Sequence, residues 1–308
     1  MKNPASEYAK SGVDIKASDK AKLLMKKLVE GTFNGNVIGG HGGFGGLYSI
    51  KELTGVDKIL VGSTDSVGTK LKLAFMTGRH DTVGQDLVNH LVNDILCCGA
   101  KPMFFFDGFY NEGEYDLAGF IIGWVDKDRI IDGKLIKPGD KIIGLASSGL
   151  HTNGYSLARR AFFDIAGMKH GDKIEETGTE VTTELMKVHY SYLDVVTPLL
   201  DLRLIKGISH ITGGGFEGNI RRIIPDGISA VIKTETWPVP GIFKAIQRIA
   251  SVSDSEMYRV FNMGIGMVLV CNTQDSGKVI SFIKDANIDV YEIGFCEKGR
   301  RRVVVEFG

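Results

Sequence analysis

Acidic, basic and glycine residues stand together directly after an apolar run near residue 60. Residues 58–63 (KILVGS) predict a strand, and Asp65, Gly68 and Lys70 follow it within STDSVGTK. The Asp65 carboxylate could bind a cation, while the amides around Gly68 and the Lys70 ammonium could bind a phosphate. An exposed turn with a capping aspartate explains the same residues. The spacing is not that of a Walker loop, so both interpretations stay open.

The helix predicted over residues 82–98 has two chemically different sides. Its apolar side contains Leu87, Val88, Leu91, Val92, Ile95 and Leu96, and its polar side contains Asp86, Asn89, His90, Asn93 and Asp94. Solvated helix faces are usually built from Lys, Glu and Gln, which are better helix formers. Short carboxylates, amides and an imidazole suit a cation that prefers oxygen ligands, such as Mg²⁺. A polar surface stripe is the alternative.

Three further glycine turns carry side chains that a plain loop does not need. Residues 147–156 (SSGLHTNGYS) place His151 and Asn153 at a predicted helix start, where free amides and the helix dipole favour an anion. Residues 210–219 (HITGGGFEGN) add a second imidazole and three consecutive glycines, which are costly to order without a ligand. A lone histidine is more often structural, so both imidazoles stay open. Residues 39–46 (GGHGGFGG) form either a hinge or a phosphate loop.

The composition excludes several classes of function. Glycine supplies 40 of the 308 residues, well above the usual ~7 %. Lys plus Arg and Asp plus Glu both total 37, so no net field attracts nucleic acid or an anionic membrane. No apolar run reaches the roughly 18 residues of a membrane span, and the N-terminus lacks the apolar core of a signal peptide. The four cysteines form neither a disulfide framework nor a zinc motif, so we expect a cytoplasmic protein.

The elements between these turns predict a mixed α/β chain with two domains. We expect a buried strand over residues 102–107. Further strands are predicted at residues 117–125, 141–146, 230–232, 266–271 and 302–307, and further helices at residues 18–30, 153–166, 188–200, 241–250 and 275–286. The turn-rich residues 130–140 are the expected boundary, which divides the chain into residues 1–132 and 133–308.

Five stretches closely resemble the phosphoribosylformylglycinamidine cyclo-ligases, which are the aminoimidazole ribonucleotide synthetases of purine biosynthesis. They are STDSVGTK (63–70), HDTVGQDLVNHLVNDILCCGAKP (80–102), SSGLHTNGYSL (147–157), HITGGGFEGNI (210–220) and EMYRVFNMGIGM (256–267), in the family's order. The likeness runs from about residue 8 to residue 307. It also places the chain in a superfamily with selenophosphate synthetase, thiamine-monophosphate kinase and a hydrogenase maturation protein.

The resemblance implies a reaction, cofactors and an assembly. The expected reaction is ATP- and Mg²⁺-dependent ring closure of formylglycinamidine ribonucleotide to 5-aminoimidazole ribonucleotide, with release of ADP and phosphate. The γ-phosphoryl group would go to the formamide oxygen, and the amidine nitrogen would then attack that carbon. The family also implies a homodimer whose N-terminal mixed sheets (residues 1–132) bind ATP and metal and join in a shared barrel. Residues 133–308 would bind the substrate on a sheet covered by helices.

Roles for particular residues follow from the same resemblance. Asp65 and Asp94 match Mg²⁺-binding aspartates, whereas His210 stands where selenophosphate synthetases have a further aspartate. The expected catalytic residues are Lys70, His151 and His210. The nucleotide is expected at Gly42, Gly43, Phe44, Gly45, Gly68, Thr69, Asn89 and Asn93. The substrate is expected at Ser148, Gly149, Asn153, Thr212, Gly213 and Gly214.

One departure from the family pattern follows PMFFFD (102–107). The family continues there through a few dozen residues with a helix, a strand and a Gly-Gly-Glu-Thr-Ala-Glu-Met-Pro motif, whereas GFYNEGEY (108–115) follows at once here. A true deletion would leave the sheet with an open edge, so we expect that the natural protein has the segment. Two alternatives to the cyclo-ligase stay open: another ATP-dependent phosphotransferase of the superfamily and, if the deletion is real, a catalytically inactive nucleotide-binding relative.

Overall fold

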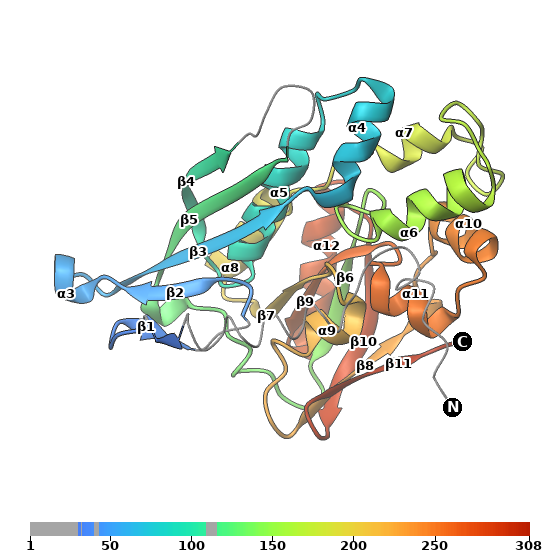
Figure 1. The fold of residues 1–308 in the computed structure, drawn as a ribbon. Helices are drawn as coiled ribbons and strands as arrows, with labels where there is room; N and C mark the ends of the chain where they lie inside the picture. Colours follow the sequence, from blue (N-terminus) through green and yellow to red (C-terminus); the bar gives the residue numbers. More distant parts are fainter. Residues whose placement is uncertain (1–29, 32, 40–42, 109–115) are drawn as a thin grey trace.

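The strands of the protein form two sheets flanked by helices (Figure 1). The computed structural model describes residues 30–308 except residues 32, 40–42 and 109–115. The predicted mixed α/β class with two sheets is confirmed. The helix predicted over residues 18–30 lies, apart from its last residue, outside the described part. Among the described residues, no helix combines the length and apolarity needed to cross a membrane.

The first sheet has the strand order β1-β2-β3-β5-β4, with every neighbouring pair antiparallel. The expectation of a mixed N-terminal sheet is therefore wrong for the described strands. Its strands are β1 (Val37–Ile38), β2 (Gly46–Ser49), β3 (Lys58–Ser66), β4 (Lys101–Gly108) and β5 (Ala118–Asp126), connected in part by α3 (Lys51–Thr54), η1 (Gly68–Lys70) and α4 (Leu71–Thr77). Helix α5 (Val83–Leu96) packs on one face, because alternate residues of β3 and β5 are buried against it. Gly119 allows this close packing, since a Cβ there would lie 2.8 Å from Leu91 Cδ1.

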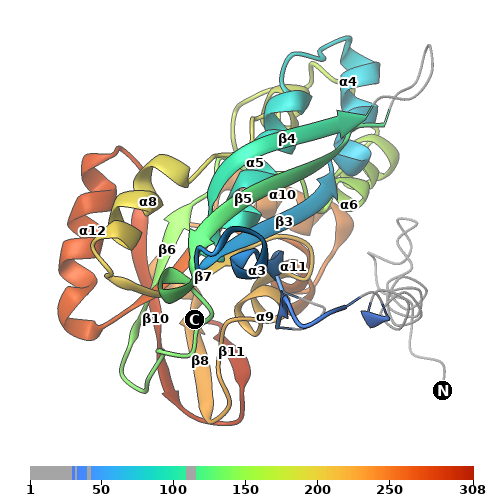
Figure 2. The ribbon, with the colours of Figure 1, turned by 90° about the vertical axis from the view of Figure 1, so that its left-hand side faces the viewer.

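The opposite face of this sheet has no helix on it among the described residues, and Figure 2 shows it in front of α5. Phe104, Phe106 and Phe120 are 46 %, 56 % and 40 % exposed there, and their rings contact one another. The strand predicted over residues 102–107 is confirmed as β4, but the prediction that it is buried is wrong. Only Phe105 points toward α5, because successive side chains of a strand alternate between its faces.

The second sheet has the order β11-β8-β10-β6-β9-β7, in which only β11 and β8 are parallel among the described pairs. Its strands are β6 (Lys141–Ala146), β7 (Ile205–His210), β8 (Ile228–Lys233), β9 (Ile265–Cys271), β10 (Val290–Lys298) and β11 (Arg302–Glu306). One face packs against α8 (Leu193–Asp201) and α12 (Ser276–Asp285). The other packs against α9 (Gly215–Ile220), α10 (Gly241–Ala250) and α11 (Asp254–Val260). Every residue of β9 is consequently buried.

Several elements differ from their predicted bounds for identifiable reasons. The helix predicted over residues 153–166 is α6 (Tyr155–Arg159) continued by the π-helical η3 (Arg160–Ile165). The helix predicted over residues 188–200 begins only at Leu193, because side chains of α5 bind the main chain of residues 189–192. Strands β7 and β10 are absent from the prediction, since Gly207 and Gly294 adjoin register shifts that interrupt their alternation. The remaining short elements are α7 (Val181–Leu185), η2 (Lys127–Arg129), η4 (Thr234–Thr236) and η5 (Thr273–Asp275).

Candidate active site

Five segments that are distant in the sequence meet at one place. One of them is α5, which contacts strands of both sheets (Figure 1). They are the end of β3, α5 itself, residues 147–153, residues 188–192 and the end of β7 with the turn that follows it. The side chains that contact one another there are Asp65, His90, Asp94, Thr152, His151, His189 and His210. The structure therefore gathers the predicted metal and imidazole residues in one place.

The polar side of α5 is buried, which a solvated helix stripe would not be. Asp86 and Asn93 are fully buried, His90 is 3 % exposed and Asp94 is 7 % exposed. The prediction of a continuous apolar side on α5 fails at Val88, because this residue is 41 % exposed. Solvent reaches the helix only along the strip that contains Val88, because the sheet covers one flank and residues 188–192 cover the other.

Asp94 is the centre of the polar cluster. Its Oδ1 accepts from His210 Nδ1 at 2.9 Å, and its Oδ2 accepts from Ser63 Oγ at 3.3 Å. His90 Nε2 lies 3.6 Å from Asp94 Oδ2 and 3.0 Å from Asp65 Oδ2, so one nitrogen stands between the two carboxylates. Burial alone would lower the pKa of His90, but the carboxylates of Asp94 and Asp65 outweigh it and raise this pKa.

Asp65 forms the solvent-facing end of the cluster, with a side chain that is 47 % exposed. Partial burial favours its neutral form, but the interaction with His90 outweighs this and leaves the pKa of Asp65 lowered. Asp65 is therefore ionised at neutral pH. A positive ligand charge can approach Asp65 from the solvent side, whereas His90 Nε2 lies between Asp65 and the buried Asp94.

His151 is held in an unusual conformation at the inner end of the cluster. Its φ is 60°, in the left-handed region that costs a residue other than glycine ~1–3 kcal/mol. Its ring stacks on His189 with centroids 3.9 Å apart, and its Nε2 accepts from the Ser148 amide at 3.3 Å. A Cβ on Gly266 would lie 2.4 Å from His151 Cε1, which explains why β9 has a glycine there. Burial lowers the pKa of both His151 and His189, so both imidazoles are neutral.

Hydrogen bonds between loops fix the part of the site formed by residues 147–153, 212–215 and 262. The Asn262 side chain accepts from Ser147 Oγ at 3.1 Å and donates to the Gly149 carbonyl at 2.9 Å. Asn153 Oδ1 accepts from the Gly213 amide at 2.9 Å, whereas its buried Nδ2 has no partner. A buried donor without a partner is available to a ligand. Gly215 must be glycine, since its φ is 59° and a Cβ would lie 2.0 Å from the Tyr258 carbonyl oxygen.

Some predicted site residues are occupied by other protein groups. Lys70 is fully buried, and its Nζ lies 2.7 Å from both Asp86 Oδ2 and the Lys187 carbonyl oxygen. Burial lowers the pKa of Lys70 and raises that of Asp86. Asn89 donates to the His189 carbonyl at 2.7 Å, and Asn93 donates to the Tyr190 carbonyl at 2.7 Å. The structure therefore does not present the Lys70 ammonium to an open cleft.

The predicted hydroxyl residues also bind protein partners. Thr69 Oγ1 is 3.3 Å from Ser156 Oγ, which joins η1 to α6. Ser148 Oγ donates to the Val188 carbonyl at 2.6 Å, and Thr212 Oγ1 donates to Asn219 Oδ1 at 3.3 Å. The Ser148 bond joins two of the five segments, residues 147–153 and residues 188–192. Gly42 lies outside the described residues.

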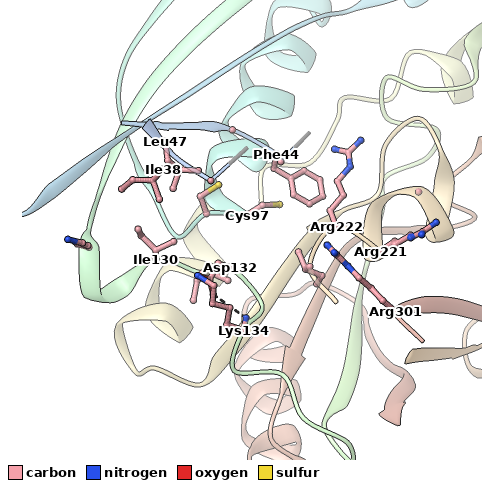
Figure 3. Close-up of a pocket in the computed structure, with 18 residues that line it drawn as sticks. Ile38, Phe44, Leu47, Cys97, Ile130, Asp132, Lys134, Arg221, Arg222 and Arg301 are labelled. Atoms are coloured by element: carbon pink, nitrogen blue, oxygen red, sulfur yellow. Dashed lines mark hydrogen bonds and ion pairs between the residues drawn. The ribbon is translucent and has the colours of Figure 1, made fainter. Parts of the chain in front are cut away.

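A pocket of about 900 Å³ lies next to the cluster (Figure 3). Gly43, Phe44 and Gly45 line it, so three of the predicted nucleotide residues share one wall. Ser63 Oγ donates to the Phe44 carbonyl at 3.3 Å and also contacts Asp94, so one hydroxyl separates the pocket wall from the cluster. The other lining residues include apolar ones (Ile38, Leu47, Ile130, Ile131) and cationic ones (Lys127, Lys134, Arg221, Arg222, Arg301). Asp132 adds one carboxylate, which pairs with Lys134 at 2.6 Å.

The three arginines gather on one side of this pocket. Figure 3 shows Arg221, Arg222 and Arg301 across the pocket from Ile38 and Leu47. The Arg222 guanidinium lies 4.8 Å from the centre of the Phe44 ring. An apolar wall opposite a cationic one suits a ligand with a flat base and a phosphate.

Sequence reasoning missed several residues of the site. His189 had no signal, because a single histidine in an apolar run has no spacing that links it to His151 or His210. Arg221 and Arg222 follow directly on the HITGGGFEGNI stretch, so their position could have suggested an anion site. Asn262 is conspicuous only because a buried amide in NMGIG needs partners.

Comparison with known proteins supports a single family. The model of the AIR synthase related protein N-terminal domain matches residues 46–135, and that of the C-terminal domain matches residues 137–306. Phosphoribosylformylglycinamidine cyclo-ligase from Alkaliphilus oremlandii is 41 % identical, covering 97 % of this chain and 99 % of the relative. The enzyme of the same name from Myxococcus xanthus is 41 % identical, covering 95 % of this chain and 96 % of the relative.

Solved structures share the fold at low sequence identity. Thiamine-monophosphate kinase from Stenotrophomonas maltophilia aligns with a TM-score of 0.55 at 12 % identity, over 92 % of this chain and 96 % of that one. Hydrogenase maturation protein HypE in complex with ATP aligns with a TM-score of 0.56 at 16 % identity, over 81 % and 82 %.

The relatives also contain residues that this chain lacks. The alignment with the Alkaliphilus oremlandii enzyme spans 337 positions against 308 residues here, so at least 29 positions have no counterpart in this chain. This difference agrees with the departure that follows residue 107. Both domain matches and near-complete coverage by curated relatives show that the chain belongs to the phosphoribosylformylglycinamidine cyclo-ligase family.

Proposed function

We propose that the protein catalyses ATP-dependent closure of formylglycinamidine ribonucleotide to 5-aminoimidazole ribonucleotide, with release of ADP and phosphate. Membership of the cyclo-ligase family supports this reaction. The structural observation that supports this reaction in the present chain is that Asp65, Asp94 and His210 lie together beside a pocket large enough for a nucleotide. We place the reaction in the cytoplasm, where ATP is available and where the four cysteines, all without disulfides, stay reduced.

Asp65 and Asp94 are the residues that would hold Mg²⁺. Their carboxylate oxygens form the hard donor set that this ion prefers, and the exposed side of Asp65 leaves room for the waters it retains. Mg²⁺ bound there would neutralise charge on the transferring phosphoryl group. His90 already lies between the two carboxylates, which supports a preference of this position for positive charge.

The pocket beside Phe44 is assigned to ATP. The adenine would lie against the apolar wall, and the turn of Gly43 and Gly45 would bring amides to the phosphates. Gly68, whose φ is 64°, would place its amide near the phosphates. Asn89, Asn93 and Thr69 would serve the nucleotide site indirectly, by holding neighbouring segments in place. Lys70 likewise acts as a positioning residue through its ion pair with Asp86, whose Oδ1 accepts from the His189 amide.

The loops on the other side of Asp94 are assigned to the substrate. Ser148, Gly149, Thr212, Gly213 and Gly214 would surround it, and the free Nδ2 of Asn153 would donate to it. Ring closure releases a proton from the attacking amidine nitrogen. The neutral imidazole of His151 or His210 can accept this proton, because burial lowers the pKa of both and leaves a nitrogen lone pair.

Residues 1–132 form the ATP-, metal- and dimer-forming domain of this proposal, and residues 133–308 form the substrate domain. All described strands of the first sheet precede residue 132, and all those of the second follow residue 133. The uncovered phenylalanines of β4 and β5 support a homodimer in which two first sheets join in a shared barrel. Such a patch on a water-soluble surface favours a protein partner.

A catalytically inactive relative is the second candidate, and the residues absent after residue 107 favour it. The intact mass of the purified natural protein separates the two first. A mass several kilodaltons above 33.6 kDa shows that the segment exists and supports the enzyme. A mass of 33.6 kDa favours the inactive relative.

The proposed reaction is tested by replacing the two carboxylates separately. We expect Asp65→Asn and Asp94→Asn each to lower kcat at least ~100-fold, since charge neutralisation by a metal contributes several kcal/mol. Asp126→Asn is the matched control, because that aspartate pairs with Lys58 on the same sheet away from the cluster. Unchanged circular dichroism with lost turnover supports the assignment, whereas near-normal turnover of Asp94→Asn contradicts it.

A further inference from the structure

Four of the seven histidines in the chain form one buried cluster. His151, His189 and His210 are at most 1 % exposed, and His90 is 3 % exposed. They come from four segments: α5, the turn after β6, the segment before α8 and the end of β7. The proposed ring closure needs at most one or two proton acceptors, so this concentration of imidazoles has a further explanation.

Hydrogen bonds around His90 and His189 determine where the protons lie. His90 Nε2 donates to Asp65 Oδ2, and because the two carboxylates raise the pKa of this ring, its Nδ1 also carries a hydrogen and donates to Thr152 Oγ1 at 2.6 Å. Thr152 Oγ1 also accepts from His189 Nδ1 at 3.5 Å. With its hydrogen on Nδ1, the neutral His189 ring has a lone pair on Nε2.

Asn93 confirms that assignment from the opposite side. Its amide orientation is fixed, because its oxygen accepts from the Tyr192 amide at 2.9 Å and its nitrogen donates to the Tyr190 carbonyl at 2.7 Å. The second hydrogen on Asn93 Nδ2 faces His189 Nε2 at 3.3 Å. A nitrogen that receives this donor carries no hydrogen of its own.

The same reasoning fixes His210. Its Nδ1 donates to the Asp94 carboxylate at 2.9 Å, so Nε2 of the neutral ring is a lone pair. That nitrogen lies 3.0 Å from His189 Nε2. Two lone pairs therefore face each other and repel, and a cation bound between the two nitrogens would remove this repulsion.

A third imidazole completes a ligand set. A nitrogen from each of His151, His189 and His210 lies within 4.8 Å of the others, and His151 Nδ1 is buried without a hydrogen-bond partner. An ion bound through Nδ1 would move the hydrogen of this neutral ring to Nε2 and end the 3.3 Å contact with the Ser148 amide. Nitrogens bound to tetrahedral Zn²⁺ at about 2.0–2.1 Å lie roughly 3.3 Å apart, close to the separation of His189 and His210. Three imidazoles suit Zn²⁺ and similar transition ions, whereas Mg²⁺ prefers oxygen ligands.

We infer that His151, His189 and His210 bind one divalent transition-metal ion of the Zn²⁺ type, at a site distinct from the carboxylates of Asp65 and Asp94. Asp94 contributes from outside this set, since its bond to His210 Nδ1 orients the ring and leaves Nε2 for the ion. The ion would connect the turn after β6, the segment before α8 and the end of β7. This inference concerns binding by the chain alone and does not depend on the proposed reaction. While the ion is bound, the lone pairs of His151 and His210 are occupied and do not accept the proton of ring closure.

The test is a titration of the purified full-length protein with Co²⁺, which reports its coordination in the visible spectrum and which Zn²⁺ displaces. We expect about one Co²⁺ per chain with the strong visible bands of a four-coordinate ion, and their loss on adding one equivalent of Zn²⁺. Zn²⁺ alone should also raise the Tm of the wild-type protein, since it binds the folded state. Wild-type protein that shows neither spectrum nor Tm shift overturns the inference.

Variants identify the ligands. His189→Gln should lose the spectrum and the Tm shift, and His151→Gln gives the same test if His189→Gln does not fold. His170→Gln is the matched control, because that histidine is exposed and remote from the cluster. His90→Gln should retain Co²⁺, because His90 belongs to the other possible set, with Asp94 and His210. Loss of Co²⁺ in His90→Gln with retention in His189→Gln contradicts the assignment.

Discussion

The two sheets differ in how completely the chain covers them. The second sheet has helices on both faces, and its strand β9, between β6 and β7, is buried along its whole length. The first sheet has α5 on one face and exposed phenylalanines on the other. The second sheet therefore obtains its stability within one chain, whereas the first has apolar area still available for a partner.

The candidate site lies beside α5, which contacts strands of both sheets. One flank of α5 closes the inner face of the first sheet, and its polar side carries Asp94 and His90 toward loops of the second sheet. Rigid loops on a self-sufficient sheet can hold strained residues such as His151. The first sheet supplies the exposed carboxylate of Asp65 and the pocket wall at Phe44.

The largest expected contrast is between core substitutions in the two sheets. Leu269→Ala in β9 should lower the free energy of unfolding by ~2–5 kcal/mol, because it leaves a cavity between two covered faces. Phe104→Ala on the uncovered face should cost the isolated chain less than ~1 kcal/mol, since this ring is already 46 % exposed. Urea unfolding at low protein concentration measures both. Equal losses would remove the distinction between the sheets.

The second prediction concerns association through the uncovered face. Phe106→Lys should weaken self-association at least ~10-fold, because burying a phenylalanine contributes about 1.5–3 kcal/mol and a buried lysine opposes it. Sedimentation velocity over a range of concentrations measures the effect. Leu202→Lys is the control, since that leucine is similarly exposed (51 % against 56 %) beyond α8. A dimer that survives Phe106→Lys but not Leu202→Lys would place the interface elsewhere.

The third prediction concerns pH, measured with EDTA present. Burial lowers the pKa of His151, His189 and His210 in the folded chain, so below about pH 6.5 the unfolded chain binds more protons. The free energy of unfolding should therefore fall as the pH falls from 6.5. His90 acts oppositely, since its pKa is raised: its contribution is complete below pH ~6.5 and is lost as the pH rises through its folded value.

His189→Gln isolates this effect. It should reduce the slope of unfolding free energy against pH below 6.5 by up to ~1.4 kcal/mol per pH unit, which is the contribution of one proton. Urea unfolding of wild type and variant at pH 7.0, 6.0 and 5.5 gives the difference. Parallel curves would show that His189 keeps an ordinary pKa.

The smallest effect is expected for an exposed ion pair between the two parts of the chain. Arg203 and Asp128 are 3.0 Å apart, but their side chains are 64 % and 70 % exposed. Asp128→Asn should change the free energy of unfolding by less than ~1 kcal/mol, because solvent screens such pairs. A larger loss would mean that surface charges, rather than α5 and its neighbours, join the two sheets.

The sequence predicted those elements whose apolar pattern is local. Strand β6 coincides with its predicted bounds, and α5 lies within its predicted range. Residues 188–192 were predicted as helix, because the pattern cannot show that Asn89 and Asn93, about 100 positions away, hold that segment. The three consecutive phenylalanines of β4 likewise do not reveal which ring faces α5.

The candidate site was also predictable only in part. The types and spacing of Asp65, Asp94, His151 and His210 indicated chemistry, and the structure brings them together. The burial of Lys70 against Asp86 was not predictable, because a strand–turn–lysine pattern is the same whether the ammonium faces a ligand or a carboxylate. His189 enters the cluster only through tertiary packing.

The most direct test of the central claim is a crystal structure of the protein with Mg²⁺ and a non-hydrolysable ATP analogue. The account predicts a triphosphate whose metal contacts Asp65 and Asp94, with the base in the pocket beside Phe44. A nucleotide bound elsewhere, with both carboxylates free of metal, would contradict it.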